Sequence, residues 1–346
     1  MKLSDFDYFL PKELIAQEPI IPRDSSRLLV LDKKTGEIEH KVFKDILKYL
    51  DPKKDVLVFN DTKVIPARLI GQKINGGKQE ILLVRPLSDD FNLNTWPAKW
   101  RVIGRPGLKV GQEILFGSNL KATVLSLLDQ ERVIVFNKSG TKLKKDIFKL
   151  GQMPLPPYIK NVSARICKKY QTAYALKDGS VAAPTAGFHF TPELLKKIKK
   201  QKIQIEYVTL HVGLGTFLPI KEKNILDHKM HFEYYNLDAK TVKSLNDAKE
   251  KGKRIIAVGT TACRVLESCV KKNHLKNNTG WTNLYIYPGY HFKFVDQLIT
   301  NFHLPKSTLL LLVSALATKK NILKAYKEAI KKQYRFFSFG DAMLIK

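Results

Sequence analysis

Hydrophobic and polar residues alternate with different periods along this chain, and the period indicates which segments form helices and which form strands. Residues Pro192–Gln201 place leucine and isoleucine on one face and lysine on the other, which predicts an amphipathic helix. Thr191 is a good N-cap for it, and proline suits the first helical position. The next residues, Ile203–His211, alternate apolar and polar side chains. They are therefore expected to form a half-buried strand.

The same alternation of strands and helices occurs elsewhere in the chain. Asp55–Asn60 and Arg254–Val258 are short apolar segments that predict buried strands. A helix is expected at Ala262–Lys272, after the second of these strands. Arg27–Asp32 and Glu37–Lys41 flank a turn and predict a β-hairpin. Together these elements predict an α/β domain.

Between Pro66 and Leu150 the pattern changes to short alternating segments divided by Gly and Pro, with almost no helical spacing. Five or six strands with turn signals predict a small antiparallel β-barrel of about 85 residues. The strand–helix alternation resumes after the proline-rich segment Met153–Ile159. The barrel, residues 66–150, is therefore expected to be inserted into an α/β domain made of residues 1–65 and 151–346.

The composition is that of a folded protein of the cytoplasm. Of its 346 residues, 44% are hydrophobic, which is ample for a core. The longest apolar run, Leu309–Ala317, is too short to span a bilayer, and the N-terminus lacks the apolar region of a signal peptide. The three cysteines form no CxxC pair, which fits a reducing compartment. A cytoplasmic protein without membrane association is expected.

The charge leaves two interpretations open. The net charge is +28 and the isoelectric point is near 9.8, which indicates a polyanionic partner such as nucleic acid. However, lysines greatly outnumber arginines, and such an excess can also come from genome composition bias. Because arginines are few, each is a better candidate for a bidentate contact than any given lysine.

Candidate functional residues follow the predicted strands. In α/β sheets the ligand crevice lies outside the carboxyl ends of the strands. Histidine and carboxylate side chains there suit proton transfer near neutral pH. The polar residues in such loops are Asp61, His189, His211, Thr260, Thr261, Tyr290 and His303. A structural role remains open for each histidine, since an isolated histidine beside a glycine turn often has no catalytic function.

Several common sites are not indicated. P-loop, GxSxG and HExxH motifs are absent. Gly213 and Gly215 lack the third glycine of the dinucleotide fingerprint. His228, His231 and Glu233 lie close together in sequence, but nothing completes a ligand set. No metal site is expected.

Nine segments in the polar loops and flanking strands carry a resemblance that spans the chain. Two long and specific segments are APTAGFHFT at Ala183–Thr191 and TNFHLPKST at Thr300–Thr308. The others include NDTKVIPARL, MPLPPYI, YQTAYA, HVGLGTFLP, HKMHFE, IAVGTTACRVLES and YRFFSFGDAML. In content and order they resemble the S-adenosylmethionine:tRNA ribosyltransferase-isomerase family of queuosine biosynthesis. Lys169 departs from the arginine that is usual in the family, and Phe188 from a common leucine.

The resemblance implies an unusual use of S-adenosylmethionine. Its ribosyl part is transferred and isomerised onto 7-aminomethyl-7-deazaguanine at the tRNA wobble position. The products are epoxyqueuosine in the tRNA, adenine and methionine. S-adenosylmethionine is then a substrate, so no cofactor is expected, and the partners are tRNA and S-adenosylmethionine. The implied fold is an α/β domain with an inserted β-barrel, and a monomer is expected.

The implied reaction needs a base for a proton beside the sulfonium and an acid for the departing adenine. The catalytic candidates are His189, His211, His231 and Glu233. The substrate-binding candidates are Asp61, Thr62, Tyr170, Gln171, Thr185, Gly187, Gly213, Gly215, Thr260, Thr261, Arg264, Tyr290, Asn301 and His303. Among these, Thr260, Thr261 and Arg264 would suit the methionine carboxylate and the ribose. Arg23 and Arg27 are candidate phosphate or base contacts.

The barrel is expected to help hold the RNA, because its polar features are basic and aromatic, with Arg101, Arg105, Trp96 and Trp100 as examples. Two rival functions remain. An RNA methyltransferase would need acidic residues around its glycine-rich loop, which HVGLGTF does not supply. A non-catalytic RNA-binding protein would not explain polar loops after several successive strands.

Overall fold

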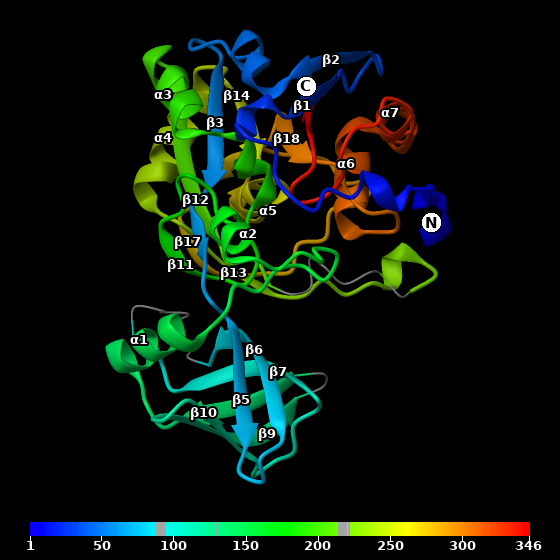
Figure 1. The fold of residues 1–346 in the computed structure, drawn as a ribbon. Coiled ribbons are helices and arrows are strands. Elements are labelled where there is room, and N and C mark those ends of the chain that lie inside the picture. The colour runs from blue at the N-terminus through cyan, green and yellow to red at the C-terminus, as the bar shows by residue number, and fades with distance from the viewer. Residues whose placement is uncertain (88–94, 129–130, 214–219, 221) are drawn as a thin grey trace. The chain divides into compact units, whose positions relative to one another are not determined.

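The computed structural model describes the chain except residues 88–94, 129–130, 214–219 and 221 (Figure 1). Its residues form two compact units, here called the sheet unit and the barrel unit. The sheet unit comprises Met1–Thr62, Pro157–Leu176 and Pro184–Lys346, and the barrel unit comprises Lys63–Pro156 and Lys177–Ala183. The predicted fold class, an α/β domain with an inserted antiparallel β-barrel, is confirmed.

The sheet unit is built on a nine-stranded mixed sheet. From one side to the other the strands are β17 (Asn278–Thr282), β13 (Glu233–Leu237), β12 (Gln204–Leu210), β3 (Asp55–Asn60), β14 (Arg254–Val258), β18 (Gln297–Asn301), β19 (Ala342–Ile345), β1 (Arg27–Leu31) and β2 (Ile38–Val42).

The strand directions determine where the loops gather. The four central strands β12, β3, β14 and β18 are parallel. Strand β13 is antiparallel to β12, β19 is antiparallel to β18, and β1 is parallel to β19. The carboxyl ends of the four central strands therefore lie at the same edge as the beginnings of β13, β19 and β1. We call this edge the site edge.

Helices cover the sheet. They are α2 (Ala164–Lys169), α3 (Pro192–Lys200), α4 (Ala239–Glu250), α5 (Thr260–Cys269), α6 (Thr308–Ala317) and α7 (Lys319–Lys331). Short 3-10 helices are η1 (Leu3–Phe6), η2 (Lys12–Leu14), η3 (Arg23–Ser25), η4 (Phe43–Tyr49), η5 (Thr185–His189) and η7 (Ile225–Asp227), and β15 (Val270–Lys271) pairs with β16 (His274–Leu275). No helix of the described residues has the length and apolarity needed to cross a membrane.

Buried apolar side chains hold these layers together. All six residues of β3 are buried, and Leu57 and Phe59 belong to a core cluster that also contains Leu194 and Ile198 of α3. The predicted cap of α3 is present, because Thr191 Oγ1 accepts a hydrogen bond from the Leu194 N–H at 3.1 Å. Burial of the apolar face of α3 against β3 thus also fixes the position of η5, which precedes α3 in the chain.

The barrel unit is a closed antiparallel barrel. Its strands are, in order, β10 (Glu131–Phe136), β7 (Lys99–Arg105), β6 (Lys78–Pro86), β5 (Arg68–Lys73), β8 (Glu113–Phe116) and β9 (Leu120–Leu128). Helix α1 (Gly140–Leu150) follows β10, where the sequence pattern indicated almost no helix. Strand β11 (Lys177–Ser180) pairs with β4 (Thr62–Val64), so Lys177–Ala183 belongs to the barrel unit.

Two aromatic residues of the barrel differ from expectation. Trp96 and Trp100 are each only 1% exposed, and their rings lie 5.7 Å apart. Trp96 packs against Phe148 of α1, with ring centroids 5.8 Å apart, and Trp100 donates its indole N–H to the Pro97 carbonyl at 2.7 Å. The prediction that these two tryptophans are exposed and help to hold RNA was therefore wrong. Arg101, also expected to contact RNA, forms a salt bridge with Glu131 at 3.3 Å.

Candidate active site

The site edge collects polar residues from loops that are far apart in sequence. Asp61 and Thr62 directly follow β3, and His211 directly follows β12. Glu233 begins β13. Asn301 ends β18, and Ser26 immediately precedes β1. Backbone direction alone therefore brings these groups to one edge of the sheet.

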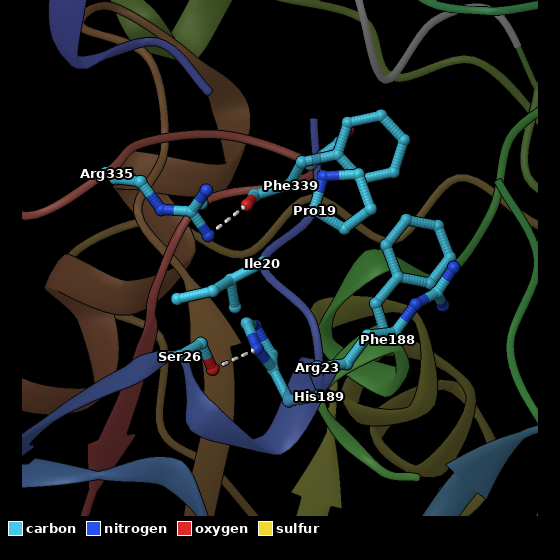
Figure 2. Close-up of a pocket in the computed structure, with 10 residues that line it drawn as sticks. Pro19, Ile20, Arg23, Ser26, Phe188, His189, Arg335 and Phe339 are labelled. Atoms are coloured by element: carbon cyan, nitrogen blue, oxygen red, sulfur yellow. Dashed lines mark hydrogen bonds between the residues drawn. The ribbon is translucent and has the colours of Figure 1, made fainter. Parts of the chain in front are cut away.

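His189 lies in a network of hydrogen bonds at this edge, and Figure 2 shows the one with Ser26. Its Nδ1 is 2.8 Å from Ser26 Oγ, and its Nε2 is 3.3 Å from Asn301 Nδ2. The same Nδ2 donates to the Phe337 carbonyl at 3.0 Å, which fixes the orientation of the amide. Because Nδ2 only donates, His189 Nε2 is the acceptor and Nδ1 carries the proton toward Ser26.

The surroundings of His189 keep it uncharged. Burial, the largest cause, and the positive charges of Arg335 and Arg23 together lower the pKa of His189 from 6.5 to about 3, against an opposing effect of the hydrogen bond with Asn301. The ring is only 3% exposed. At neutral pH His189 is thus a neutral hydrogen-bonding group and a weak base.

A small, partly open pocket adjoins His189. Arg23, Arg335, Phe188 and Phe339 are among its lining residues (Figure 2). The Phe188 and Phe339 rings are stacked with centroids 5.7 Å apart, and the Arg23 guanidinium lies 4.9 Å from the Phe188 centroid.

Both arginines of this pocket are held by backbone carbonyls. Arg23 donates to the carbonyls of Gln171, at 2.9 Å, and Lys169. Arg335 donates to the Phe339 carbonyl at 2.9 Å and to the Glu18 carbonyl at 3.1 Å. The backbone carbonyl of the predicted binding residue Gln171 therefore helps to hold Arg23, which lines this pocket.

A second group surrounds His211. Its Nδ1 is 2.7 Å from Thr62 Oγ1, and its ring stacks on Tyr234 with centroids 5.9 Å apart. Asn60 connects the two loops, because its Oδ1 accepts from the N–H of Thr62 at 3.1 Å and of Leu210 at 3.0 Å. The orientation of the His211 ring is thus set by side chains at the ends of two adjacent parallel strands.

Asp61, beside Thr62, also connects β3 with β12. Its carboxylate accepts a hydrogen bond from Thr209 Oγ1 at 2.7 Å, and its N–H donates to the Val208 carbonyl at 2.9 Å. Asp61 is only 7% exposed. Its contacts thus hold the loop that presents Thr62 to His211.

Glu233 and Arg264 form a buried ion pair next to this group. Glu233 Oε2 accepts from Arg264 Nη1, and Glu233 Oε1 accepts from the Gly213 N–H at 2.9 Å. Arg264 Nε donates to the Leu284 carbonyl at 3.1 Å. Glu233 therefore holds the backbone two residues beyond His211. Gly215 lies outside the described residues.

The N-terminus of α5 lies beside η5. Gly259, the N-cap of α5, has φ +92°, a conformation that favours glycine. A Cβ at Gly259 would lie 3.6 Å from Ala186 Cβ and 3.6 Å from Thr261 Oγ1. Thr185, the first residue of η5, donates to Asn301 Oδ1 at 3.5 Å. The predicted residues Thr185, Thr260 and Thr261 are thus neighbours of the His189 network.

Gly187, also in η5, is a position where only glycine fits. A Cβ there would lie 1.9 Å from Tyr174 Oη. Its predicted role in substrate binding stays a prediction. The structure shows that it allows η5 to pack closely against Tyr174.

Other predicted residues have structural contacts. His303 Nε2 is 2.9 Å from Thr300 Oγ1, and burial lowers the pKa of His303 to about 3. Tyr170 is fully buried against Phe188. His231 is exposed at the surface. Among the described residues, no three His, Cys, Asp or Glu side chains are grouped so as to hold a metal ion.

Tyr290 belongs to a loop organised by Glu267 of α5. The Tyr290 hydroxyl donates to Glu267 Oε2 at 2.9 Å. The same carboxylate accepts from the N–H groups of Lys293, Phe294 and Val295 at 2.9–3.0 Å. Tyr290 thus helps to hold the loop that leads into β18.

Sequence reasoning missed Ser26, Arg335 and Phe339. Arg335 and Phe339 lie in the segment YRFFSFGDAML, whose family resemblance was the available signal. Ser26 had no signal, because it is 163 residues from His189 in the chain.

Comparisons with known proteins match the whole chain or nearly all of it. The family model described as queuosine biosynthesis protein matches residues 3–345. S-adenosylmethionine:tRNA ribosyltransferase-isomerases of Halothermothrix orenii and Clostridioides difficile are 55% and 53% identical, with complete coverage of both chains in each case. The crystal structure of an S-adenosylmethionine tRNA ribosyltransferase from Thermotoga maritima is 41% identical, with a TM-score of 0.57, and covers 99% of this chain and 100% of that one.

Proposed function

Because the chain belongs to the queuosine biosynthesis protein family and is a transferase-isomerase of that family, we propose that its substrates are S-adenosylmethionine and tRNA. It transfers and isomerises the ribosyl part of S-adenosylmethionine onto 7-aminomethyl-7-deazaguanine at the wobble position. The products are epoxyqueuosine in the tRNA, adenine and methionine. The observation that carries this proposal is the identity of 53–55% with two enzymes of that name over complete chains.

The arrangement at the site edge supports a role for His211 in proton transfer. The sulfonium charge acidifies the protons of the adjacent ribosyl carbon, and one of them must pass to a base. His211 is held by Thr62 and stacked on Tyr234 at the carboxyl end of β12, where ligands of α/β sheets bind. Histidine is well suited to proton transfer near neutral pH.

His189 has a different part in this proposal. Its low pKa makes it neutral during the reaction, so it acts by hydrogen bonding and by positioning Ser26 and Asn301. Glu233 positions the loop after His211 through the Gly213 N–H. Of the four catalytic candidates, His211 is therefore the one we assign to proton transfer, and His231 has no role in this assignment.

The test is identification of the products. The chain is incubated with S-adenosylmethionine and an anticodon stem-loop that carries 7-aminomethyl-7-deazaguanine, and small molecules and nucleosides are measured by mass spectrometry. The proposal expects adenine, methionine and epoxyqueuosine. Formation of S-adenosylhomocysteine with a methylated nucleoside would identify a methyltransferase instead. Binding of the stem-loop without any product would identify a non-catalytic RNA-binding protein.

A further inference from the structure

Two buried polar groups near the N-terminus of α5 have no hydrogen-bond partner among the described residues. They are Thr261 Oγ1 and Arg264 Nη2. Thr261 is 9% exposed and Arg264 is 5% exposed, so bulk water satisfies neither group well. An unpaired buried donor is costly, most of all when it is charged. Such groups indicate a ligand that pairs with them.

The geometry of α5 directs both groups to one place. Thr261 and Arg264 are three residues apart, so they lie on the same face of the helix. Side chains of a helix lean toward its N-terminus, which brings Arg264 toward Thr261. Thr261 Oγ1 is also only 3.6 Å from the position of a Cβ on the N-cap residue Gly259. The hydroxyl therefore lies close to the N-terminal end of α5.

The backbone at this end adds further donors. The first N–H groups of an α-helix have no acceptor within the helix, and the helix dipole makes this end positive. In α3, α4, α6 and α7 a Thr, Asp or Ser side chain accepts such an N–H. Gly259 has no side chain that could do so in α5. An anion is the ligand that helix N–H groups, a hydroxyl and a guanidinium share.

We propose that Gly259, Thr261 and Arg264 form an anion site that binds the α-carboxylate of the methionyl part of S-adenosylmethionine. This rests on the proposed function, because that carboxylate is the anionic group of S-adenosylmethionine. A phosphate of tRNA is the other anion available to this protein. The carboxylate is favoured because Thr261 and Arg264 are more than nine-tenths buried, where the end of a small molecule reaches more readily than a polymer backbone.

The test uses calorimetric titration with S-adenosylmethionine and with its decarboxylated analogue. In Thr261→Val the hydroxyl is replaced by a methyl group of similar size. It should weaken S-adenosylmethionine binding by about tenfold or more, since a hydrogen bond to a charged group contributes at least that much. Binding of the decarboxylated analogue should change little. Thr261→Ser retains the hydroxyl and should bind like the native chain.

The matched control is Thr241→Val. Thr241 is the third residue of α4, is 7% exposed, and lies after the end of β13, at the opposite edge of the sheet. This variant should bind both ligands like the native chain. Melting temperatures of all variants establish that they are folded.

Three results would overturn the carboxylate site. One is that Thr261→Val weakens the binding of S-adenosylmethionine and of its decarboxylated analogue equally, or weakens neither. Another is a weaker affinity for the anticodon stem-loop with unchanged S-adenosylmethionine binding, which would assign the site to a phosphate. If Thr261→Val does not fold, equal affinity of the native chain for both ligands contradicts the site. Failure of the native chain to bind S-adenosylmethionine at all would instead contradict the proposed function.

Discussion

At the scale of single residues, surroundings separate two histidines that look alike in the sequence. Both His189 and His211 stand beside small residues and near strand ends. His189 is enclosed by Ser26, Asn301 and two arginines, and its pKa falls to about 3. His211 instead bonds to Thr62 and stacks on Tyr234. Only His211 is therefore assigned to proton transfer.

Replacement of His211 by alanine tests this assignment. The rate of adenine release at saturating substrates should fall about 10²–10⁴-fold, the usual contribution of general acid–base catalysis. His274→Ala is the control, because His274 is exposed on β16. Adenine release is followed by liquid chromatography. Near-native turnover of His211→Ala would rule out proton transfer by this residue.

Two of the buried histidines, His189 and His303, also predict how stability depends on pH. The folded pKa values of His189 and His303 are about 3, below the ordinary value of 6.5. The unfolded chain therefore binds more protons between these values, and the free energy of unfolding should decrease as pH falls through this window. Each histidine contributes a slope of up to about 1.4 kcal/mol per pH unit.

Urea denaturation of the native chain and of His303→Gln at pH 7 and pH 5 measures this effect. The variant lacks one of the two titrating groups, so its unfolding free energy should fall less between the two pH values. Equal losses in both proteins would show that His303 is not held neutral by burial.

At the scale of elements, one carboxylate organises the loop between β17 and β18. Glu267 of α5 accepts four hydrogen bonds, from Tyr290, Lys293, Phe294 and Val295. Glu267→Gln would direct an amide NH₂ at groups that only donate here. The variant should lose about 2 kcal/mol or more of unfolding free energy, since donors left unpaired are costly.

Denaturation curves check this prediction against Glu250→Gln. Glu250 ends α4 and is exposed, with His274 as a salt-bridge partner at 3.4 Å. This control should change stability by less than about 0.5 kcal/mol. A loss for Glu267→Gln no larger than that of the control would mean that the loop does not depend on the carboxylate.

Strand periodicity and the rule that ligands bind at carboxyl ends were enough to predict the sheet, the barrel and the positions of Asp61 and His211. The rule about carboxyl ends does not cover polar residues that lie at the beginning of an antiparallel strand. Ser26 precedes β1, and β1 and β19 begin at the site edge because they are antiparallel to β18. Long-range pairing of this kind has no local sequence signal. Periodicity likewise could not distinguish the buried Trp96 from an exposed aromatic residue.

At the scale of the whole molecule, the net charge of +28 predicts that tRNA binding depends strongly on salt. Each neutralised phosphate should contribute about 0.7–0.9 to the slope of log affinity against log salt. Fluorescence anisotropy of a labelled tRNA from low to physiological ionic strength measures this slope. A flat profile would mean that the charge reflects composition and not a docking surface.

The central claim is that the site edge transfers the ribosyl part of S-adenosylmethionine and not its methyl group. The most direct measurement compares two isotopically labelled forms of this substrate, one with ¹³C in the ribosyl carbons and one with ¹³C in the methyl carbon. The account predicts that the ribosyl label enters the wobble nucleoside, that the methyl label leaves in methionine, and that His211→Ala slows the transfer as strongly as it slows adenine release. A wobble nucleoside that carries the methyl label, or neither label, would contradict it.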